Sequence, residues 1–174
     1  LGGVCFAAWF AYVDFIGIES QVGESLLSTA AIRQELFGGL LVFDSFTAFL
    51  RLVLAGFLIL YIAMTKLSGI PDREDGADFY SLVLGSSLGM CLMVSANNLL
   101  MVFMAVEMAS VPSYVLAGML KGRPASSEAA LKYAVYGAGT AGVMLYGISL
   151  ISGVLGTLVL PDISYEMSRT LAAG

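Results

Sequence analysis

The chain has 174 residues, of which 59% are hydrophobic and only 12% are charged. Soluble domains carry about 25% charged residues, so this composition predicts an integral membrane protein with several helices. The net charge of −5 argues against nucleic-acid binding, which needs a basic face. Histidine is absent, and the two cysteines, Cys5 and Cys91, stand singly in apolar runs. We therefore expect no metal site and no cofactor in this chain.

The first apolar segment, residues 1–16, begins the chain without Met and without a basic stretch before it. This start fits a signal peptide poorly. At 16 residues the segment is also shorter than the roughly 20 residues that cross a bilayer. We expect a truncated helix, and hence a chain that is part of a longer polytopic protein.

Four further apolar segments are expected to be membrane helices, at about residues 45–64, 79–95, 98–120 and 127–155. Asp44 precedes the first of these four and suits a helix N-cap. The second and third are separated by a turn so short that they must be antiparallel neighbours. The expected fold class is all-α: residues 1–174 form one transmembrane bundle of about five segments, the first truncated.

The connecting segments predict the orientation. Residues 17–43 form a polar link, and Gly38-Gly39 between short β-favouring runs predicts a small hairpin on the membrane surface. If the helices alternate in direction, one side of the membrane has four basic residues, Lys66, Arg73, Lys121 and Arg123, and the side of residues 17–43 has two, Arg33 and Arg169. The excess of basic residues favours a cytoplasmic placement of the first side. We therefore expect residues 66–78 and 121–126 in the cytoplasm and residues 17–43 outside.

Small residues predict where helices pack. Gly85 and Gly89 form a GxxxG pattern, and Ala138 with Gly142 repeats the spacing in a later segment. Such faces let helix backbones approach closely in lipid.

Glu107 is the single ionisable carboxylate between Phe79 and Leu120. It lies near the middle of segment 98–120, roughly 13 Å from the nearer end. A charge at that depth costs roughly 2.5–3.5 kcal/mol, so such residues are usually functional. Desolvation favours the neutral carboxyl, which suits a group that takes up and releases protons. The alternative is a neutral carboxyl that hydrogen-bonds two helices together.

Pro112 follows Glu107 by five residues and has no N–H for the carbonyl of Met108, which predicts a kink. That carbonyl is expected to form a polar pocket near Glu107 with three hydroxyl groups, those of Ser110, Ser113 and Tyr114.

Two cations also fall within apolar segments. Lys132 lies roughly 8 Å inside the boundary of segment 127–155 and either takes part in proton transfer or extends to the interface. It lies about 10 Å closer to the cytoplasm than Glu107, so direct pairing would need a water chain or a bend. Arg51 shares a helix face with Asp44, and we expect an interfacial pair or a structural charge that sets the local field.

Three stretches resemble one known family: residues 95–100 (Ser-Ala-Asn-Asn-Leu-Leu), residues 107–116, which begin Glu-Met-Ala-Ser-Val-Pro, and residues 127–133 (Ser-Glu-Ala-Ala-Leu-Lys-Tyr). They are similar to the subunit N family of bacterial respiratory complex I, the NADH-quinone oxidoreductase, within the antiporter-like membrane subunits. The resemblance is clearest over residues 79–157, which are expected to be antiporter-like helices.

The resemblance implies a proton-translocating subunit of the bacterial inner membrane, coupled to quinone reduction elsewhere in the complex. Glu107 and Lys132 correspond to its intramembrane relay residues. Partners would be the lipid bilayer and the other membrane subunits of complex I; NADH, flavin, iron–sulfur clusters and quinone would belong to other subunits. Because the family's further relay lysines would lie beyond Gly174, the chain is expected to be an N-terminal fragment. Alternatives are a subunit of a multisubunit cation/proton antiporter and a purely structural membrane subunit.

Overall fold

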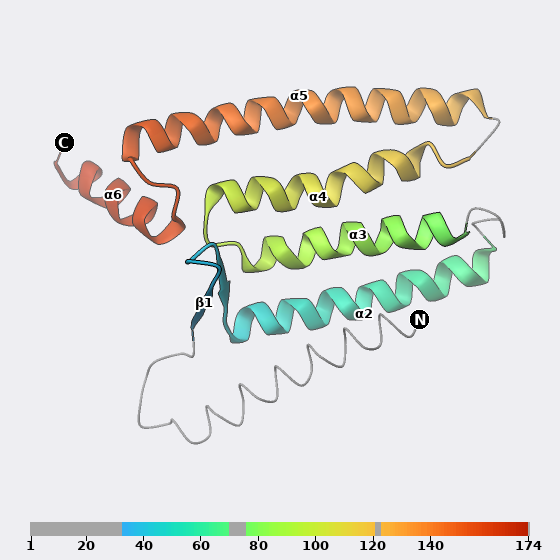
Figure 1. The fold of residues 1–174 in the computed structure, drawn as a ribbon, viewed down its shortest axis with the longest axis horizontal. Helices are drawn as coiled ribbons and strands as arrows, with labels where there is room; N and C mark the ends of the chain where they lie inside the picture. Colours follow the sequence, from blue (N-terminus) through green and yellow to red (C-terminus); the bar gives the residue numbers. More distant parts are fainter. Residues whose placement is uncertain (1–32, 70–75, 121–122, 174) are drawn as a thin grey trace, which may run out of the picture.

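A computed structural model of the chain describes residues 33–69, 76–120 and 123–173. The expected first membrane segment and most of the polar link lie outside these ranges, as do Arg73 and Lys121. The described elements, in chain order, are β1 (Gln34–Leu36), β2 (Leu41–Phe43), α2 (Ser45–Ser68), α3 (Gly76–Ser95), α4 (Leu99–Ala117), α5 (Pro124–Leu155) and α6 (Leu160–Ala173) (Figure 1).

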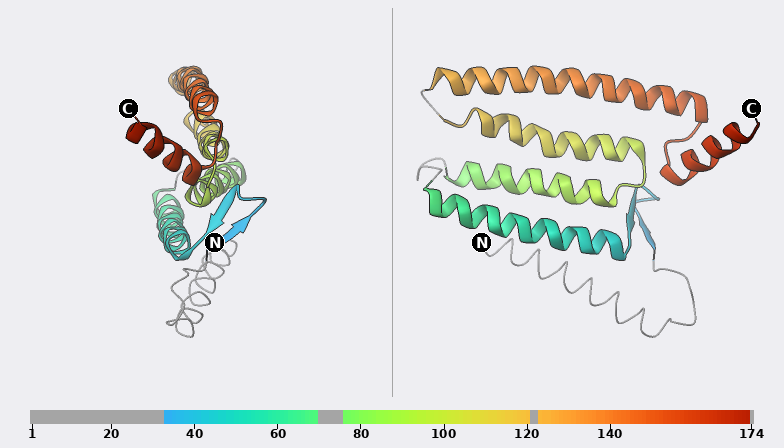
Figure 2. Two further views of the ribbon diagram at one scale, coloured as in Figure 1. Left: turned by 90° about the vertical axis from the view of Figure 1, so that its left-hand side faces the viewer. Right: turned by 180° about the vertical axis from the view of Figure 1, so that it is seen from behind.

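Helices α2 to α5 lie side by side in chain order, each antiparallel to the next (Figure 1). Seen along their axes they form a single curved row (Figure 2). All four are long and apolar enough to cross a membrane. This confirms the all-α, multi-pass architecture, and the antiparallel contact of α3 with α4 is confirmed with it.

Local sequence explains the helix ends. The Asp44 carboxylate accepts a hydrogen bond from the Thr47 amide at 2.8 Å, and the Asn98 side chain accepts one from Leu100 at 2.9 Å, so each caps an N-terminus. Gly69 and Gly156 end α2 and α5 with positive φ values of 68° and 71°, which only glycine adopts without strain. The α5 helix begins three residues earlier than expected, because Pro124 is well suited to a first helical position.

A two-stranded antiparallel hairpin precedes α2 and pairs Gln34 with Phe43 and Leu36 with Leu41. Its turn contains the Gly38-Gly39 pair, and both glycines have positive φ, as does Phe37 at 54°. The hairpin lies at the end of the layer where α3 turns into α4, and α6 lies at the same end (Figure 1).

The sequence predicted no helix beyond residue 155, whereas the structure contains the helix α6 there. Apolar residues recur at helical spacing along it, at Leu160, Ile163, Met167 and Leu171. Asp162 in its first turn complements the helix dipole. The signal was therefore present, but it was shorter than a membrane span.

Within the described ranges the layer is one helix thick, so few side chains are fully enclosed. The buried apolar residues are Leu41, Ala48, Ile62, Val83, Ala105 and Ile148. Large side chains such as Val143 and Val154 remain 73% and 82% exposed on the surface of the layer. These faces are available to lipid or to further protein.

Candidate functional site

Glu107 lies in the middle of α4, about 12 Å along the axis from Leu99. It is the only Asp, Glu, Lys or Arg in this helix, and it is half-buried. Among the residues that the structure describes, none donates a hydrogen bond to its carboxylate or forms an ion pair with it. An isolated carboxylate at the centre of a membrane-length helix is therefore the main chemical feature of the layer.

One side of the Glu107 turn packs against α3. The Ser86 hydroxyl donates a hydrogen bond to the Ala109 carbonyl at 2.9 Å. Gly89 lies so close to α4 that an added Cβ would be 2.6 Å from the Ala109 nitrogen. The predicted GxxxG face is therefore a contact between two helix backbones.

The opposite side of α4 packs against α5. The rings of Tyr114 and Tyr133 meet edge to face with centroids 4.7 Å apart, and the Tyr114 ring covers Gly137. Glu107 precedes Tyr114 by seven residues, or two helical turns, so it lies on this α5-facing side of α4.

Pro112 lies inside α4, which continues through it as one helix that bends in its second half (Figure 1). The Ser110 hydroxyl donates to the Val106 carbonyl at 2.7 Å, and the Ser113 hydroxyl donates to the Ser110 carbonyl at 2.5 Å. Ser113 Oγ also lies 3.2 Å from the Tyr133 hydroxyl. These hydroxyls thus bond within α4 or to α5, and a polar pocket shared with Glu107 stays a prediction.

Lys132 pairs with Glu128 one turn earlier on α5, with Nζ 2.5 Å from Oε1, and each side chain is 65% exposed. The contact of Tyr133 with Tyr114 places Lys132 near the level of Tyr114, about 10 Å along the axis from Glu107. Lys132 is also turned about 100° from Tyr133 around α5. The described residues therefore do not bring Lys132 and Glu107 together, in agreement with the distance expected from the sequence.

Arg51 does not pair with Asp44, so of the two alternatives the interfacial pair is wrong and the structural charge remains. The carboxylate of Asp44 caps α2, and the guanidinium of Arg51 instead donates to Ser95 Oγ at 2.6 Å. It also lies 5.1 Å from the ring centroid of Phe43. Its Nε is buried without a partner among the described residues. Arg51 thus connects α2 to β2 and to the end of α3.

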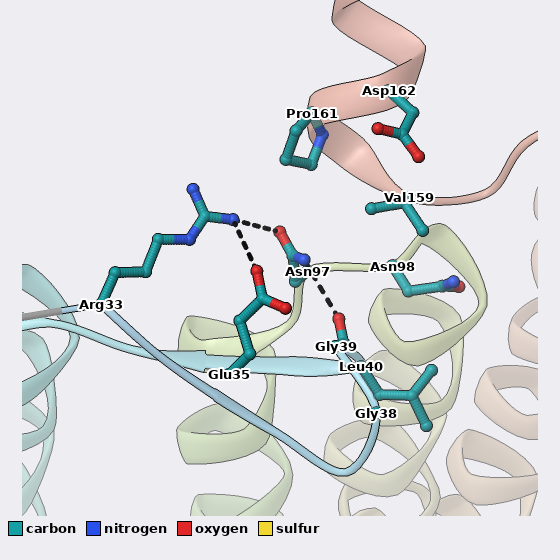
Figure 3. A pocket seen from close by; sticks show the side chains of 10 residues that line it. All are labelled: Arg33, Glu35, Gly38, Gly39, Leu40, Asn97, Asn98, Val159, Pro161 and Asp162. Carbon is teal, nitrogen blue, oxygen red and sulfur yellow. Dashed lines mark hydrogen bonds and ion pairs between the residues drawn. The ribbon is translucent and has the colours of Figure 1, made fainter.

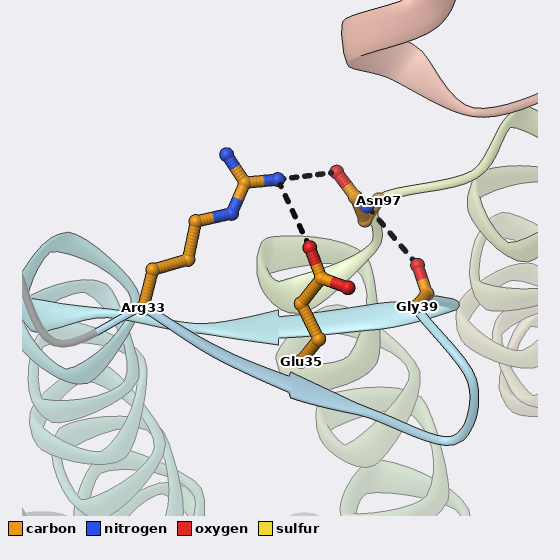
Figure 4. Close-up of polar contacts among 4 residues, drawn as sticks. All are labelled: Arg33, Glu35, Gly39 and Asn97. Atoms are coloured by element: carbon orange, nitrogen blue, oxygen red, sulfur yellow. Dashed lines mark hydrogen bonds and ion pairs between the residues drawn. The ribbon is translucent and has the colours of Figure 1, made fainter.

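A junction that was not predicted from the sequence is centred on Asn97, in the turn between α3 and α4 (Figures 3 and 4). Its backbone N–H donates to the Leu40 carbonyl at 2.9 Å, and its carbonyl accepts from the Leu160 amide at 3.0 Å. Its side chain donates to the Gly39 carbonyl at 3.0 Å and accepts from Arg33 at 3.3 Å. One buried residue therefore joins the hairpin, the turn and the start of α6.

An open groove of about 600 Å³ adjoins this junction (Figure 3). Arg33 and Glu35 form an ion pair of 4.0 Å beside it, and Asp162 lines its other wall. Within the described part of the chain, no three His, Cys, Asp or Glu residues are close enough to hold a metal ion together.

Comparisons with known proteins agree with this architecture. Residues 96–173 match the family described as NADH:quinone oxidoreductase/Mrp antiporter, TM. The chain is 37% identical over 156 residues to NADH-quinone oxidoreductase subunit N 2 of Sorangium cellulosum, covering 87% of this chain and 31% of that protein. It is 38% identical over 169 residues to subunit N 2 of Symbiobacterium thermophilum, covering 97% and 32%. The chain thus spans about a third of the length of these relatives.

Two solved structures resemble the fold. A chain of the archaeal membrane-bound sulfane sulfur reductase, a respiratory membrane complex, superposes with a TM-score of 0.73 at 22% identity, covering 93% of this chain and 32% of that chain. A chain of respiratory complex I from Thermus thermophilus superposes with a TM-score of 0.61 at 29% identity, covering 91% and 36%. Four membrane-length helices and bacterial relatives fit a multi-pass protein of a bacterial inner membrane. The chain is therefore an antiporter-like transmembrane segment of the NADH:quinone oxidoreductase/Mrp antiporter family, similar in sequence to subunit N.

Proposed function

We propose that this chain belongs to a proton-translocating membrane subunit of a bacterial NADH-quinone oxidoreductase, in which Glu107 takes up and releases a proton within the membrane. The observation that carries the proposal is the isolated, half-buried carboxylate at the centre of α4. The assignment to an NADH-quinone oxidoreductase is supported by the names of the relatives, and the antiporter-like character of the subunit is supported by the family description.

Electrostatics can drive the protonation change. A cation approaching to ~6 Å in a medium of effective dielectric constant ~20 stabilises an ionised carboxylate by about 3 kcal/mol. This interaction changes the ratio of ionised to protonated carboxyl by on the order of 100-fold. Quinone reduction in other subunits would control the position of such a cation. Those other subunits would bind NADH, flavin, iron–sulfur clusters and quinone. The partners of this chain would be the other membrane subunits of the complex.

Lys132 would connect Glu107 with the cytoplasm. It lies near the end of α5 that follows residues 121–126, which we place in the cytoplasm together with residues 66–78, and the hairpin would then lie outside. The separation of about 10 Å along the axis exceeds a hydrogen bond, so water molecules would carry the proton between the two residues. Its place in the first part of α5, near that end of the helix, suits Lys132 to exchange protons with the aqueous side.

The test is Glu107→Gln in the complete subunit within the assembled complex, because glutamine keeps the shape and cannot carry the proton. We expect NADH-driven proton translocation into inverted membrane vesicles to fall sharply while the complex still assembles. Glu166→Gln is a matched control, since Glu166 lies in α6, outside the membrane-length helices, and pairs with Arg169. Unchanged translocation with normal assembly in Glu107→Gln would contradict the proposal.

The family description also names the Mrp antiporters, which favours a cation/proton antiporter subunit as a second candidate. Proton flux that depends on sodium or potassium, and needs no NADH-oxidising partner, would distinguish it. A purely structural subunit is the third candidate. In that case Glu107→Gln would impair assembly and leave translocation per assembled complex unchanged.

A further inference from the structure

Helix α3 holds the turn of α4 that carries Glu107 through two small residues, Ser86 and Gly89. The Ser86 hydroxyl donates to the Ala109 carbonyl at 2.9 Å. A Cβ added to Gly89 would lie 2.6 Å from the Ala109 nitrogen, 2.9 Å from the Met108 carbonyl carbon and 3.0 Å from the Ala105 oxygen. These atoms belong to residues before and after Glu107 in the chain. The contact therefore packs against the α3-facing side of the helical turn that carries Glu107.

The contact acts on backbone that α4 stabilises incompletely by itself. Pro112 has no N–H, so the Met108 carbonyl lacks its usual helical donor four residues later. The Ser86 hydroxyl of α3 donates to the next carbonyl, that of Ala109, and so stabilises the α4 backbone beside the carbonyl that lacks its donor. All three atoms closest to the added Cβ belong to the α4 backbone, so none of them is the end of a flexible side chain that could move aside.

Helical geometry relates this contact to the direction of the carboxyl. Ala105 is buried and faces α3, and Glu107 is turned about 200° from it around α4. That turn places Glu107 on the side of Tyr114, which contacts α5. A shift of the turn away from α3 would therefore displace the carboxyl relative to α5.

We propose that Ser86 and Gly89 are positioning residues for Glu107: they hold its turn from the α3 side so that the carboxyl is presented to α5. The consequence for transport rests on the proposed function, whereas the consequence for the surroundings of the carboxyl does not.

The test uses matched pairs of variants in the complete subunit within its membrane complex. Gly89→Ala is compared with Gly85→Ala, whose Cβ would meet only Pro112 Cγ, at 3.9 Å. Ser86→Ala is compared with Ser87→Ala, because the Ser87 hydroxyl bonds to Leu84 of its own helix. The readouts are proton translocation per NADH oxidised and the infrared carboxyl bands of Glu107, assigned as those lost in Glu107→Gln.

We expect Gly89→Ala and Ser86→Ala to shift the Glu107 bands, and Gly85→Ala and Ser87→Ala to leave them in place. Translocation should fall roughly tenfold or more in Gly89→Ala, since a misplacement of about 1 Å can cost on the order of 100-fold in rate. Ser86→Ala keeps every backbone contact, so it decides the matter if Gly89→Ala does not assemble.

Glu107 bands that stay unshifted in Ser86→Ala, and in Gly89→Ala if it assembles, overturn the positioning role even if Glu107→Gln abolishes translocation. Conversely, if Glu107→Gln leaves translocation unchanged, the proposed function fails, and the band shifts alone still decide whether the two residues position the carboxyl.

Discussion

Arg51 and Ser95 join α2 to the last residue of α3 through a hydrogen bond of 2.6 Å between Nη2 and Oγ. The guanidinium also lies against the face of Phe43, with 5.1 Å between Cζ and the ring centroid. The bond couples α2 to the turn that leads into α4, so Arg51 stabilises the arrangement around α4 without touching Glu107.

A double-mutant cycle of Arg51→Leu with Ser95→Ala should give a coupling free energy of about 1–2 kcal/mol, as for a partly exposed hydrogen bond from a charged donor. Arg51→Lys should restore little of it, because an ammonium group lacks the planar face that stacks on Phe43. Thermal unfolding of the purified protein in detergent measures each variant. Strict additivity of the two substitutions would show that the bond contributes nothing.

Asn97 should be the most sensitive residue of the turn between α3 and α4. Asn97→Ala leaves the Gly39 carbonyl without its side-chain donor and Arg33 without its acceptor, which should cost about 1–3 kcal/mol. Asn97→Asp keeps an acceptor for Arg33 but turns a carboxylate oxygen toward the Gly39 carbonyl, so it should not rescue the loss. Hydrogen exchange of the hairpin amides measures the effect.

The adjacent Asn98 offers the control for that experiment. Its side chain caps α4 by accepting from Leu100, and serine fills the same role, so Asn98→Ser should leave hairpin exchange unchanged. Equal exchange rates in Asn97→Ala and the unsubstituted protein would contradict the role of Asn97 as the junction between the hairpin and α6.

The helices were predictable because their signals are local. Asp44 and Asn98 cap helices within three residues of themselves, and each apolar run is long enough to cross a bilayer. The depth of Glu107 in the membrane could be predicted from its position in such a run. The residues around it could not be predicted, because Tyr133 and Gly137 contact α4 only in the register in which α5 packs against it. No short segment of sequence encodes that register.

The junction at Asn97 could not be predicted from neighbouring residues. Its partners Arg33 and Leu160 lie more than 60 positions away in opposite directions along the chain. A pair of Arg51 with Asp44 was one of two alternatives, because both lie on one helix face. Asp44 instead caps α2, and Ser95 comes within reach of Arg51 only when α3 packs beside α2. Helical periodicity gives faces of single helices, and contacts between helices need the tertiary structure.

Lys132→Gln should lower proton translocation with almost no change in stability. The pair with Glu128 is an exposed contact one turn apart on one helix, which contributes roughly 0.3–0.5 kcal/mol. Glu128→Gln should change stability equally little and leave more of the translocation, because Lys132 keeps its charge. Unfolding temperature and vesicle proton uptake are measured together. A large stability loss in Lys132→Gln would assign the residue a packing role.

Gly137 and Gly139 provide a test of the contact between α4 and α5 that orients Tyr114. An added Cβ at Gly137 would overlap the Tyr114 ring, whereas one at Gly139 would meet no atom within 4 Å. Gly137→Ala should therefore destabilise the protein by about 1–3 kcal/mol through overpacking, and Gly139→Ala should be neutral or stabilising by up to about 1 kcal/mol.

The double variant Gly137→Ala with Tyr114→Leu should recover much of that stability, because the smaller side chain leaves room for the new Cβ. Thermal unfolding in detergent, with near-ultraviolet circular dichroism of the Tyr114–Tyr133 pair, follows each variant. If Gly137→Ala and Gly139→Ala behave alike, the Tyr114 ring does not occupy the space over Gly137. The α5-facing side of α4 would then be packed differently, and the placement of Glu107 on that side would lose its support.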